Sequence, residues 1–170
     1  MKYEFIIGVD PGLNYLAVSL LDSNKKLMDF NCIEQEQEKN LENKYNNINR
    51  KFTKWFSNFN KEKTIIILEF PVFMIKTENT KKVDKATEII INAANKFDLK
   101  IHKIAPNHVK FLITGNSRIS KVGLFEQVKG MVSNIPSTLS AYTNNHITDS
   151  IAIGLTGILD IEKDTPLSLA

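Results

Sequence analysis

The sequence predicts an α/β fold built on a five-stranded mixed sheet, in which strands 1-2-3 form an antiparallel meander, the later strands run parallel, and helices cover both faces. Two observations lead to this prediction. Short segments rich in branched and aromatic residues follow one another closely at the start of the chain, and helical and strand patterns then alternate. Because the 170 residues fit one compact domain, we expect a single domain over residues 1–160 and a short tail over residues 161–170.

Three strands are predicted at the start of the chain. Residues 3–9 are rich in aromatic and branched side chains and end at the turn formers Asp10, Pro11 and Gly12. Residues 15–21 and 26–33 follow as strands, joined by a polar turn at residues 22–25. Because tight turns join strands that run in opposite directions, these three form the antiparallel meander.

Helices and strands alternate in the rest of the chain. Apolar residues recur at three- and four-residue steps over residues 41–59 and again over residues 86–97, which predicts two amphipathic helices. The apolar run at residues 64–70 predicts a strand covered on both faces. The last predicted elements are a strand at residues 100–104 and three helices: one after Pro106, one after Ser120 and one from about residue 144 to residue 159.

Composition sets the broad class of the protein. Hydrophobic residues make up 42% and charged residues 24%, which allows both a buried core and a hydrated surface. The apolar runs are too short to span a bilayer, the N-terminus lacks the layout of a signal peptide, and the single Cys32 cannot form an internal disulfide. We therefore expect a cytoplasmic protein without membrane association, in which Cys32 is a small apolar residue rather than a nucleophile.

The net charge of +3 is small, but its distribution along the chain is uneven. Residues 76–129 contain eleven Lys and Arg against five acids, a local excess of six positive charges. Such a bias fits nucleic-acid binding and fits a solvated surface about equally well.

Three carboxylates stand where stability alone would not place them. Asp10 closes the first predicted strand, Glu69 closes the fourth, and Asp149 lies among isoleucines of the last helix. A carboxylate with apolar neighbours is costly unless a cation meets it. If the first and fourth strands are adjacent and parallel, Asp10 and Glu69 emerge at the edge where α/β sheets place their sites. His146 precedes Asp149 by three residues, so both project from one face of the helix.

Together these four side chains predict a site for divalent cations. Carboxylate oxygens favour Mg²⁺ or Mn²⁺, and one imidazole is tolerated. Two such ions about 3.5–4 Å apart can activate a water and stabilise the leaving oxygen of a phosphodiester. Three of the four also have a structural explanation when taken alone: Asp10 as a turn former, Glu69 as a solvent-facing strand end, and His146 as a helix cap or surface residue. Their combination is far less expected by chance than any one of them.

Five segments carry recognisable motifs in a fixed order. Residues 8–12 read Gly-Val-Asp-Pro-Gly, Glu69 is followed by a loop that ends in Lys76, and residues 106–121 form a basic segment continued by residues 131–132. Residues 146–152, which contain His146 and Asp149, are the last motif. Over roughly residues 6–155 the chain thereby resembles the RuvC family of Holliday-junction resolvases.

The chain also departs from the family's common pattern. His146 stands where many bacterial members carry Asp and others His, and one residue is inserted at positions 70–71. Residues 85–88 replace the Gly- and Arg-containing helix motif of bacterial members, so the resemblance leaves the dimer geometry and the cutting specificity open. Abundant Lys, Asn and Ile suggest an AT-rich genome, and the divergence would suit a bacteriophage member. The sequence leaves a bacterial and a phage origin open, so the expected setting is the cytoplasm of a bacterial cell or of a phage-infected host.

The resemblance implies a ribonuclease-H-like nuclease domain and a homodimer that nicks two strands of a four-way DNA junction symmetrically. It implies two Mg²⁺ ions per active site, for which Mn²⁺ can substitute. Asp10 would bridge both ions, Glu69 would bind one, and Asp149 with His146 the other. Lys121 would lie close to the scissile phosphate and offset its charge, which makes it the fifth expected catalytic residue.

A further set of side chains is expected to hold the DNA. Lys110 and Lys121 would contact backbone phosphates, and Phe73 would wedge or stack at the junction centre. The sequence identifies no branch-migration motor as a partner. The complete expected DNA-binding set is Lys76, Lys110, Arg118, Lys121 and Phe73.

Three other functions fit part of the pattern. A nuclease of the same fold that acts on other branched DNA or on RNA–DNA hybrids would use the same residues, so the sequence separates it poorly from a resolvase. A non-catalytic junction-binding module would not need an intact Asp10, Glu69 and Asp149. An actin-like ATP-binding protein also ends its first strand in a Gly-x-Asp-x-Gly turn, but it needs two such domains and a much longer chain.

Overall fold

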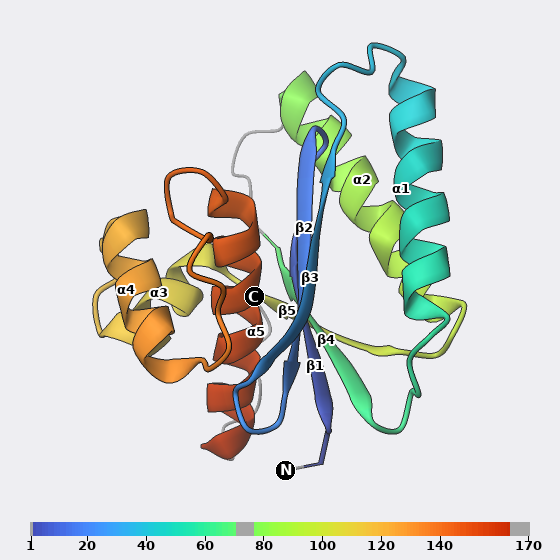
Figure 1. Ribbon diagram of the computed structural model, residues 1–170. Helices are drawn as coiled ribbons and strands as arrows, with labels where there is room; N and C mark the ends of the chain where they lie inside the picture. Colours follow the sequence, from blue (N-terminus) through green and yellow to red (C-terminus); the bar gives the residue numbers. More distant parts are fainter. Residues whose placement is uncertain (1, 71–76, 164–170) are drawn as a thin grey trace.

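A five-stranded sheet lies between two layers of helices in the computed structural model, which describes residues 2–70 and 77–163 (Figure 1). The strand order is β3-β2-β1-β4-β5. Neighbours in the β1-β2-β3 part pair antiparallel, whereas β1 pairs parallel with β4 and β4 with β5, so the predicted mixed sheet is confirmed. The strands are β1 (Phe5–Asp10), β2 (Tyr15–Asp22), β3 (Leu27–Glu34), β4 (Thr64–Glu69) and β5 (Lys100–Ile104).

Helices cover both faces of the sheet. Helices α1 and α2 lie on one face, and α5 lies on the other with α3 and α4 outside it (Figure 1). Side-chain oxygens of Asn40, Thr77 and Ser120 accept hydrogen bonds from backbone N–H groups of the following turns, which is why α1, α2 and α4 begin where they do. None of the helices described is long and apolar enough to cross a bilayer. The helices are α1 (Leu41–Phe56), α2 (Glu78–Asn95), α3 (Pro106–Thr114), α4 (Lys121–Met131) and α5 (Asn145–Glu162).

The central strands are buried on both faces, so the molecule has two apolar cores. Alternation along β1 directs Ile6 toward α5 and Ile7 toward α1 and α2. Alternation along β4 does the same with Ile65 and Ile66. This two-sided burial explains why β1 and β4 are nearly continuous apolar runs in the sequence.

Strand β1 and helix α5 meet at the level of their backbones. A Cβ atom on Gly8 would lie 2.0 Å from the carbonyl oxygen of Ser150. The same oxygen accepts a hydrogen bond of 2.8 Å from the Ser19 hydroxyl on β2. Because a side chain at position 8 would push α5 outward, Gly8 determines how closely the first turns of α5, with His146 and Asp149, approach the end of β1.

Two helix ends differ from the sequence-based expectation. Helix α1 ends at Phe56, and Phe59 instead lies beyond the helix with its ring 5.0 Å from that of Trp55. Helix α5 continues past residue 159 to Glu162, because Asp160 is only 2% exposed and its carboxylate is hydrogen-bonded to His108 Nε2 at 2.8 Å. The boundary predicted at residue 160 therefore falls inside this helix, and the division into one domain and a tail stays a prediction.

Candidate metal-dependent active site

The carboxyl ends of β1 and β4 place two carboxylates side by side. In their parallel register Val9 lies opposite Leu68, and Asp10 and Glu69 are the next residues of the two strands. Asp10 is 8% exposed, and Glu69 is half-buried. The edge of the sheet at these two strand ends is therefore acidic and largely shielded from water. We call this edge, with Asp10 and Glu69, the acidic edge.

The start of α5 adds an imidazole to this edge. His146 Nδ1 and Asp10 Oδ2 are 2.8 Å apart. Because the carboxylate oxygen accepts, the proton of this hydrogen bond is on Nδ1. Burial raises the pKa of Asp10, and the hydrogen bond to His146 partly opposes that rise. The same hydrogen bond raises the pKa of His146.

Asp149, one turn further along α5, pairs with a lysine from another helix. Lys121, the first residue of α4, donates from Nζ to Asp149 Oδ2 at 2.6 Å. Burial lowers the pKa of Lys121, but the hydrogen bond and the charge of Asp149 outweigh it, so the pKa is raised and the ammonium is favoured. A cation is thus held beside the acidic edge.

Electrostatic coupling shows that the three acids share one environment. Burial raises the pKa of Glu69 to about 7, and the charges of Asp10 and Asp149 add to that rise. The charges of Lys121 and Lys110 oppose it only in part. Asp149 likewise contributes to the raised pKa of Asp10. The structure therefore brings residues 10, 69, 146 and 149 into one neighbourhood, with Lys121 beside them.

The chemistry of these donors fits a divalent cation. Three carboxylates and an imidazole are the ligands that Mg²⁺ and Mn²⁺ accept, and a bound cation would relieve the repulsion among the acids. Within residues 2–70 and 77–163, no three His, Cys, Asp or Glu side chains are arranged as a metal-binding group. Asp10 and Asp149 instead use their Oδ2 atoms in hydrogen bonds to His146 and Lys121, which leaves the second oxygen of each carboxylate outside these two bonds.

Comparison with known proteins identifies the family. The family model described as "Crossover junction endodeoxyribonuclease RuvC" matches residues 6–157. The chain belongs to the RuvC family. A RuvC relative from Prochlorococcus marinus (strain NATL1A) is 28% identical over 160 residues, covering 90% of this chain and 97% of the relative. One from Porphyromonas gingivalis is 31% identical over 137 residues, covering 77% of this chain and 68% of the relative.

Solved RuvC structures have the same fold. The structure of T. thermophilus RuvC in complex with a Holliday junction substrate superposes with a TM-score of 0.79 at 18% identity, covering 96% of this chain and 98% of the other. A second Thermus thermophilus RuvC structure has a TM-score of 0.78. The ribonuclease-H-like fold predicted from the sequence is therefore confirmed. RuvC enzymes are metal-dependent nucleases, in agreement with the chemistry of the acidic edge.

Of the five residues expected to bind DNA in this RuvC chain, the structure describes Lys110, Lys121 and Arg118. Lys110 on α3 and Lys121 on α4 both lie close enough to Glu69 to affect its pKa. Arg118 is exposed in the loop between α3 and α4. Phe73 and Lys76 lie outside the described residues.

Sequence reasoning missed Tyr15 at this RuvC site. Its ring stacks on that of His146, with centroids 5.3 Å apart and planes within 2° of parallel. Its hydroxyl donates to Glu36 at 2.7 Å. These contacts restrain the imidazole that is bonded to Asp10. One signal was available: β2 begins at Tyr15 and runs antiparallel to β1, so its start lies at the edge where β1 ends with Asp10.

Proposed function

We propose that this protein is a crossover junction endodeoxyribonuclease that resolves four-way Holliday junctions by metal-dependent nicking. The observation that carries the proposal is the gathering of Asp10, Glu69 and Asp149 at one edge of the sheet, in a chain that the RuvC model matches from residue 6 to residue 157. A buried cluster of acids weakens the fold without a bound cation, so its presence supports a catalytic role over a structural one.

The acidic edge would hold two Mg²⁺ ions, with Mn²⁺ as a substitute. Asp10 would be shared between the ions, Glu69 would bind one, and Asp149 and His146 the other. When bound, such ions supply activation of a water and stabilisation of the leaving oxygen. The chain itself contributes orientation, because the hydrogen bond to His146 holds the Asp10 carboxylate in place before any metal arrives.

Basic side chains beside the acids would bind the DNA backbone. Lys121 would offset the charge of the scissile phosphate and Lys110 would hold a neighbouring one; their closeness to Glu69 supports these roles. Arg118, exposed between the two helices that carry these lysines, extends the surface. Phe73 and Lys76 remain part of the proposed set, and so does a homodimer that places two such sites on one junction.

Cleavage of a mobile four-way junction with mapped nicks tests the function. We expect paired, symmetric nicks with Mg²⁺ or Mn²⁺ and none without metal. Asp10→Asn should abolish cleavage, by about a thousandfold or more, yet bind the junction as tightly as the parent chain, because it removes a metal ligand and no phosphate contact.

Substrate comparison separates the alternatives. A replicative fork and an RNA–DNA hybrid, assayed beside the junction, should be cut much more slowly. Preferential cutting of either would indicate a nuclease of the same fold with another substrate. Tight junction binding without cleavage at any metal concentration would indicate a binding module, and normal cleavage by Asp10→Asn in Mg²⁺ would refute the site.

A further inference from the structure

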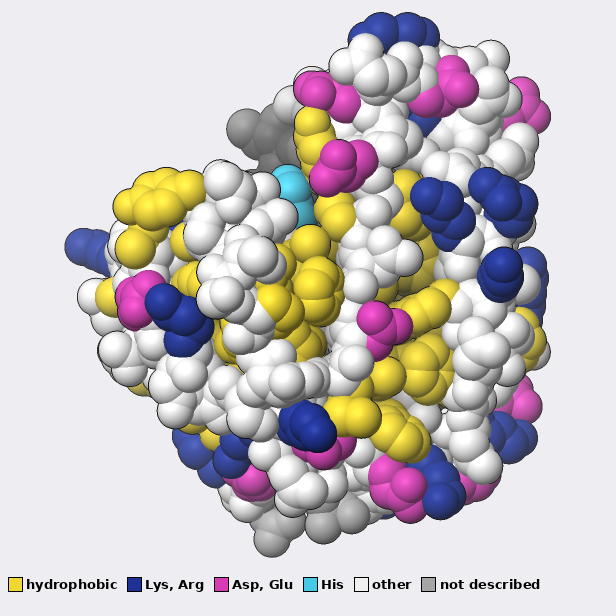
Figure 2. All heavy atoms as spheres, viewed as in Figure 1, with side chains coloured by type: hydrophobic (Ala, Val, Ile, Leu, Met, Phe, Trp, Pro, Cys, Tyr) yellow, Lys and Arg dark blue, Asp and Glu magenta, His cyan; other side chains and the backbone are white. Residues whose placement is uncertain are grey.

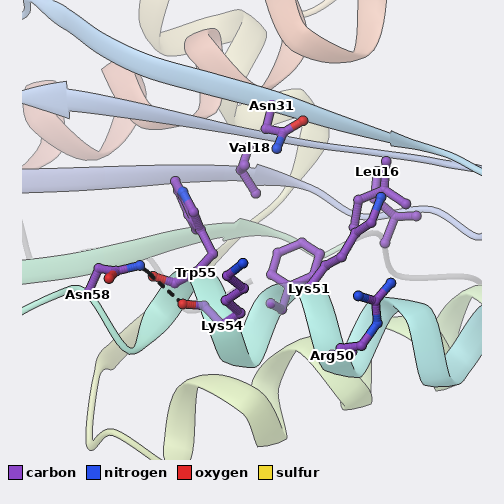
Figure 3. Close-up of a pocket in the computed structure, with 10 residues that line it drawn as sticks. Leu16, Val18, Asn31, Arg50, Lys51, Lys54, Trp55 and Asn58 are labelled. Atoms are coloured by element: carbon purple, nitrogen blue, oxygen red, sulfur yellow. Dashed lines mark hydrogen bonds between the residues drawn. The ribbon is translucent and has the colours of Figure 1, made fainter.

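A hollow lies on the face of the sheet away from Asp10. It is a groove of about 370 Å³ between α1 and the strands β2 and β3 (Figure 3). Asp10 pairs with Ala17 and lies on the α5 side, whereas Leu16 and Val18, which flank Ala17, point to the α1 side and line the groove. The sheet therefore separates this α1 groove from the acidic edge.

The floor of the α1 groove is apolar. Leu16, Val18 and Ile33 contribute from the strands, and Phe52 and Trp55 contribute from α1. Figure 3 labels Leu16, Val18 and Trp55 among them. The groove is within the size range of ligand-binding pockets, roughly 300–1,000 Å³. A floor of this kind favours an occupant with a large apolar side chain, since burial of that side chain supplies affinity.

The rim of the groove is cationic. Arg50, Lys51 and Lys54, all on α1 and all exposed, line it together with the amide of Asn31, and no acid is among the described residues that line it. In the part of the chain that the structure describes, none of the three cations forms an ion pair. Figure 2 shows dark-blue side chains gathered over α1 beside the yellow apolar surface. Because like charges one helical turn apart repel, an anionic occupant would stabilise this stretch of α1.

We propose that the α1 groove binds an acidic peptide segment of a partner protein. A large apolar side chain of the peptide lies on the floor, between Val18 and Trp55, and the acidic residues next to it pair with Arg50, Lys51 and Lys54. The apolar contact supplies most of the affinity, and the ion pairs set the direction and the rate of binding. The partner would be tethered to the nuclease without occupying the acidic edge.

A nucleic acid fits this groove less well than a peptide does. Phosphates would satisfy the cations, but a duplex backbone has no apolar side group for the floor. Unstacked bases need an open aromatic face, whereas Trp55 is partly buried and packs against Phe56 and Phe59. A single-stranded oligonucleotide is therefore the competing occupant to test.

Fluorescence of the chain's one tryptophan tests the proposal directly, because Trp55 is that residue and lines the groove. The probe is a short synthetic peptide of alternating Asp and Glu that ends in Ile-Phe, titrated into the full chain. We expect saturable quenching or a shift of the emission. Replacement of the probe's Phe by Ala should weaken binding by about tenfold or more.

Charge reversal provides the matched variants. Lys51→Glu combined with Lys54→Glu should weaken peptide binding by about tenfold or more, whereas Lys100→Glu, at the exposed start of β5 on the opposite edge of the sheet, should leave it unchanged. Circular dichroism checks that each variant is folded, and junction cleavage should be the same in all three proteins.

Three outcomes would overturn the proposal. The first is that the emission of the parent chain does not respond to the peptide. The second is that the double variant binds the peptide as tightly as the parent does. The third is that a single-stranded oligonucleotide displaces the peptide and that the same charge reversals weaken binding of the oligonucleotide. Because neither Lys51 nor Lys54 belongs to the acidic edge, each of these results is independent of the cleavage experiments.

Discussion

At the scale of single residues, the acids of the candidate site differ in the contacts that offset the cost of burying a carboxylate. Asp10 is the most shielded and has a hydrogen bond to His146, and Asp149 has an ion pair with Lys121. The pKa of Glu69 rises to about 7 because burial and the charges of Asp10 and Asp149 outweigh the two lysines nearby. Ionisation of Glu69 therefore costs the metal-free fold stability.

Substitution of Glu69 should reveal this cost as a function of pH. The ordinary pKa is 4.5 and the folded one about 7, so ionisation destabilises the fold increasingly from pH 4.5 upward and fully above pH 7. Without metal, Glu69→Gln should therefore be more stable than the parent by about 1–3 kcal/mol near pH 8, with the difference disappearing near pH 4.

Urea unfolding in a chelator at several pH values measures that difference. Added Mg²⁺ should stabilise the parent chain but stabilise Glu69→Gln far less, because the variant lacks one proposed ligand. Equal stability of the two proteins near pH 8 would contradict the raised pKa and the crowding of acids behind it.

At the scale of elements, α5 combines close packing on the sheet with the presentation of site residues. A Cβ atom on Gly157 would lie 2.3 Å from Cγ1 of Ile67 on β4, and one on Gly8 would meet the Ser150 oxygen at 2.0 Å. Small residues at these contacts let α5 approach the centre of the sheet. His146 and Asp149, near the helix start, reach the strand ends because the rest of the helix packs so closely.

Gly8→Ala should therefore damage both stability and cleavage. The new methyl group requires a shift of α5, which should cost about 1–3 kcal/mol of unfolding free energy and move His146 away from Asp10. Gly130→Ala on α4 is the control, since its Cβ meets nothing within 4 Å and alanine favours helix. Thermal unfolding and junction cleavage measure the two effects; a Gly8→Ala protein as stable and active as Gly130→Ala would show that α5 tolerates displacement.

At the scale of the whole molecule, charge is divided between the two faces of the sheet. On the α5 side, α3 and α4 bring Lys110 and Lys121 to the acidic edge, with Arg118 in the loop between them. On the α1 side, the cations of the α1 groove face an apolar floor. The small net charge of +3 is thus compatible with two separate groups of cations, one beside the acidic edge, where we propose DNA binding, and one in the α1 groove, where we propose peptide binding.

Junction binding should depend steeply on salt as a consequence. Each phosphate contact releases counterions, so affinity should fall by about tenfold or more between roughly 50 and 200 mM salt. Lys110→Ala should lower the slope of log affinity against log salt by about one, whereas Lys51→Ala, in the α1 groove, should leave the slope unchanged. Titrations of a labelled junction at several salt concentrations measure both slopes, and a flat response would argue against phosphate contacts at the acidic edge.

Local patterns were enough to predict the types and order of the elements. Alternation and apolar runs depend on burial of one or both faces of a strand, and three- and four-residue spacing depends on the helical turn, so both are visible in the residues themselves. Asp10 and Glu69 were identifiable because an acid that closes an apolar strand is unusual at that position. The family motifs then implied their common role and that of His146 and Asp149.

Contacts between distant segments needed the tertiary structure. The bond between His146 and Asp10, the stacking of Tyr15, the pairing of Lys121 with Asp149 and the burial of Asp160 against His108 join residues that no local period relates. The α1 groove is another case, because its two sides come from strands and a helix that are separate in the chain. Such contacts depend on which faces of the elements pack together and on how closely they pack. Burial of apolar surface across the whole sheet determines this packing, and a residue's neighbours in the sequence do not.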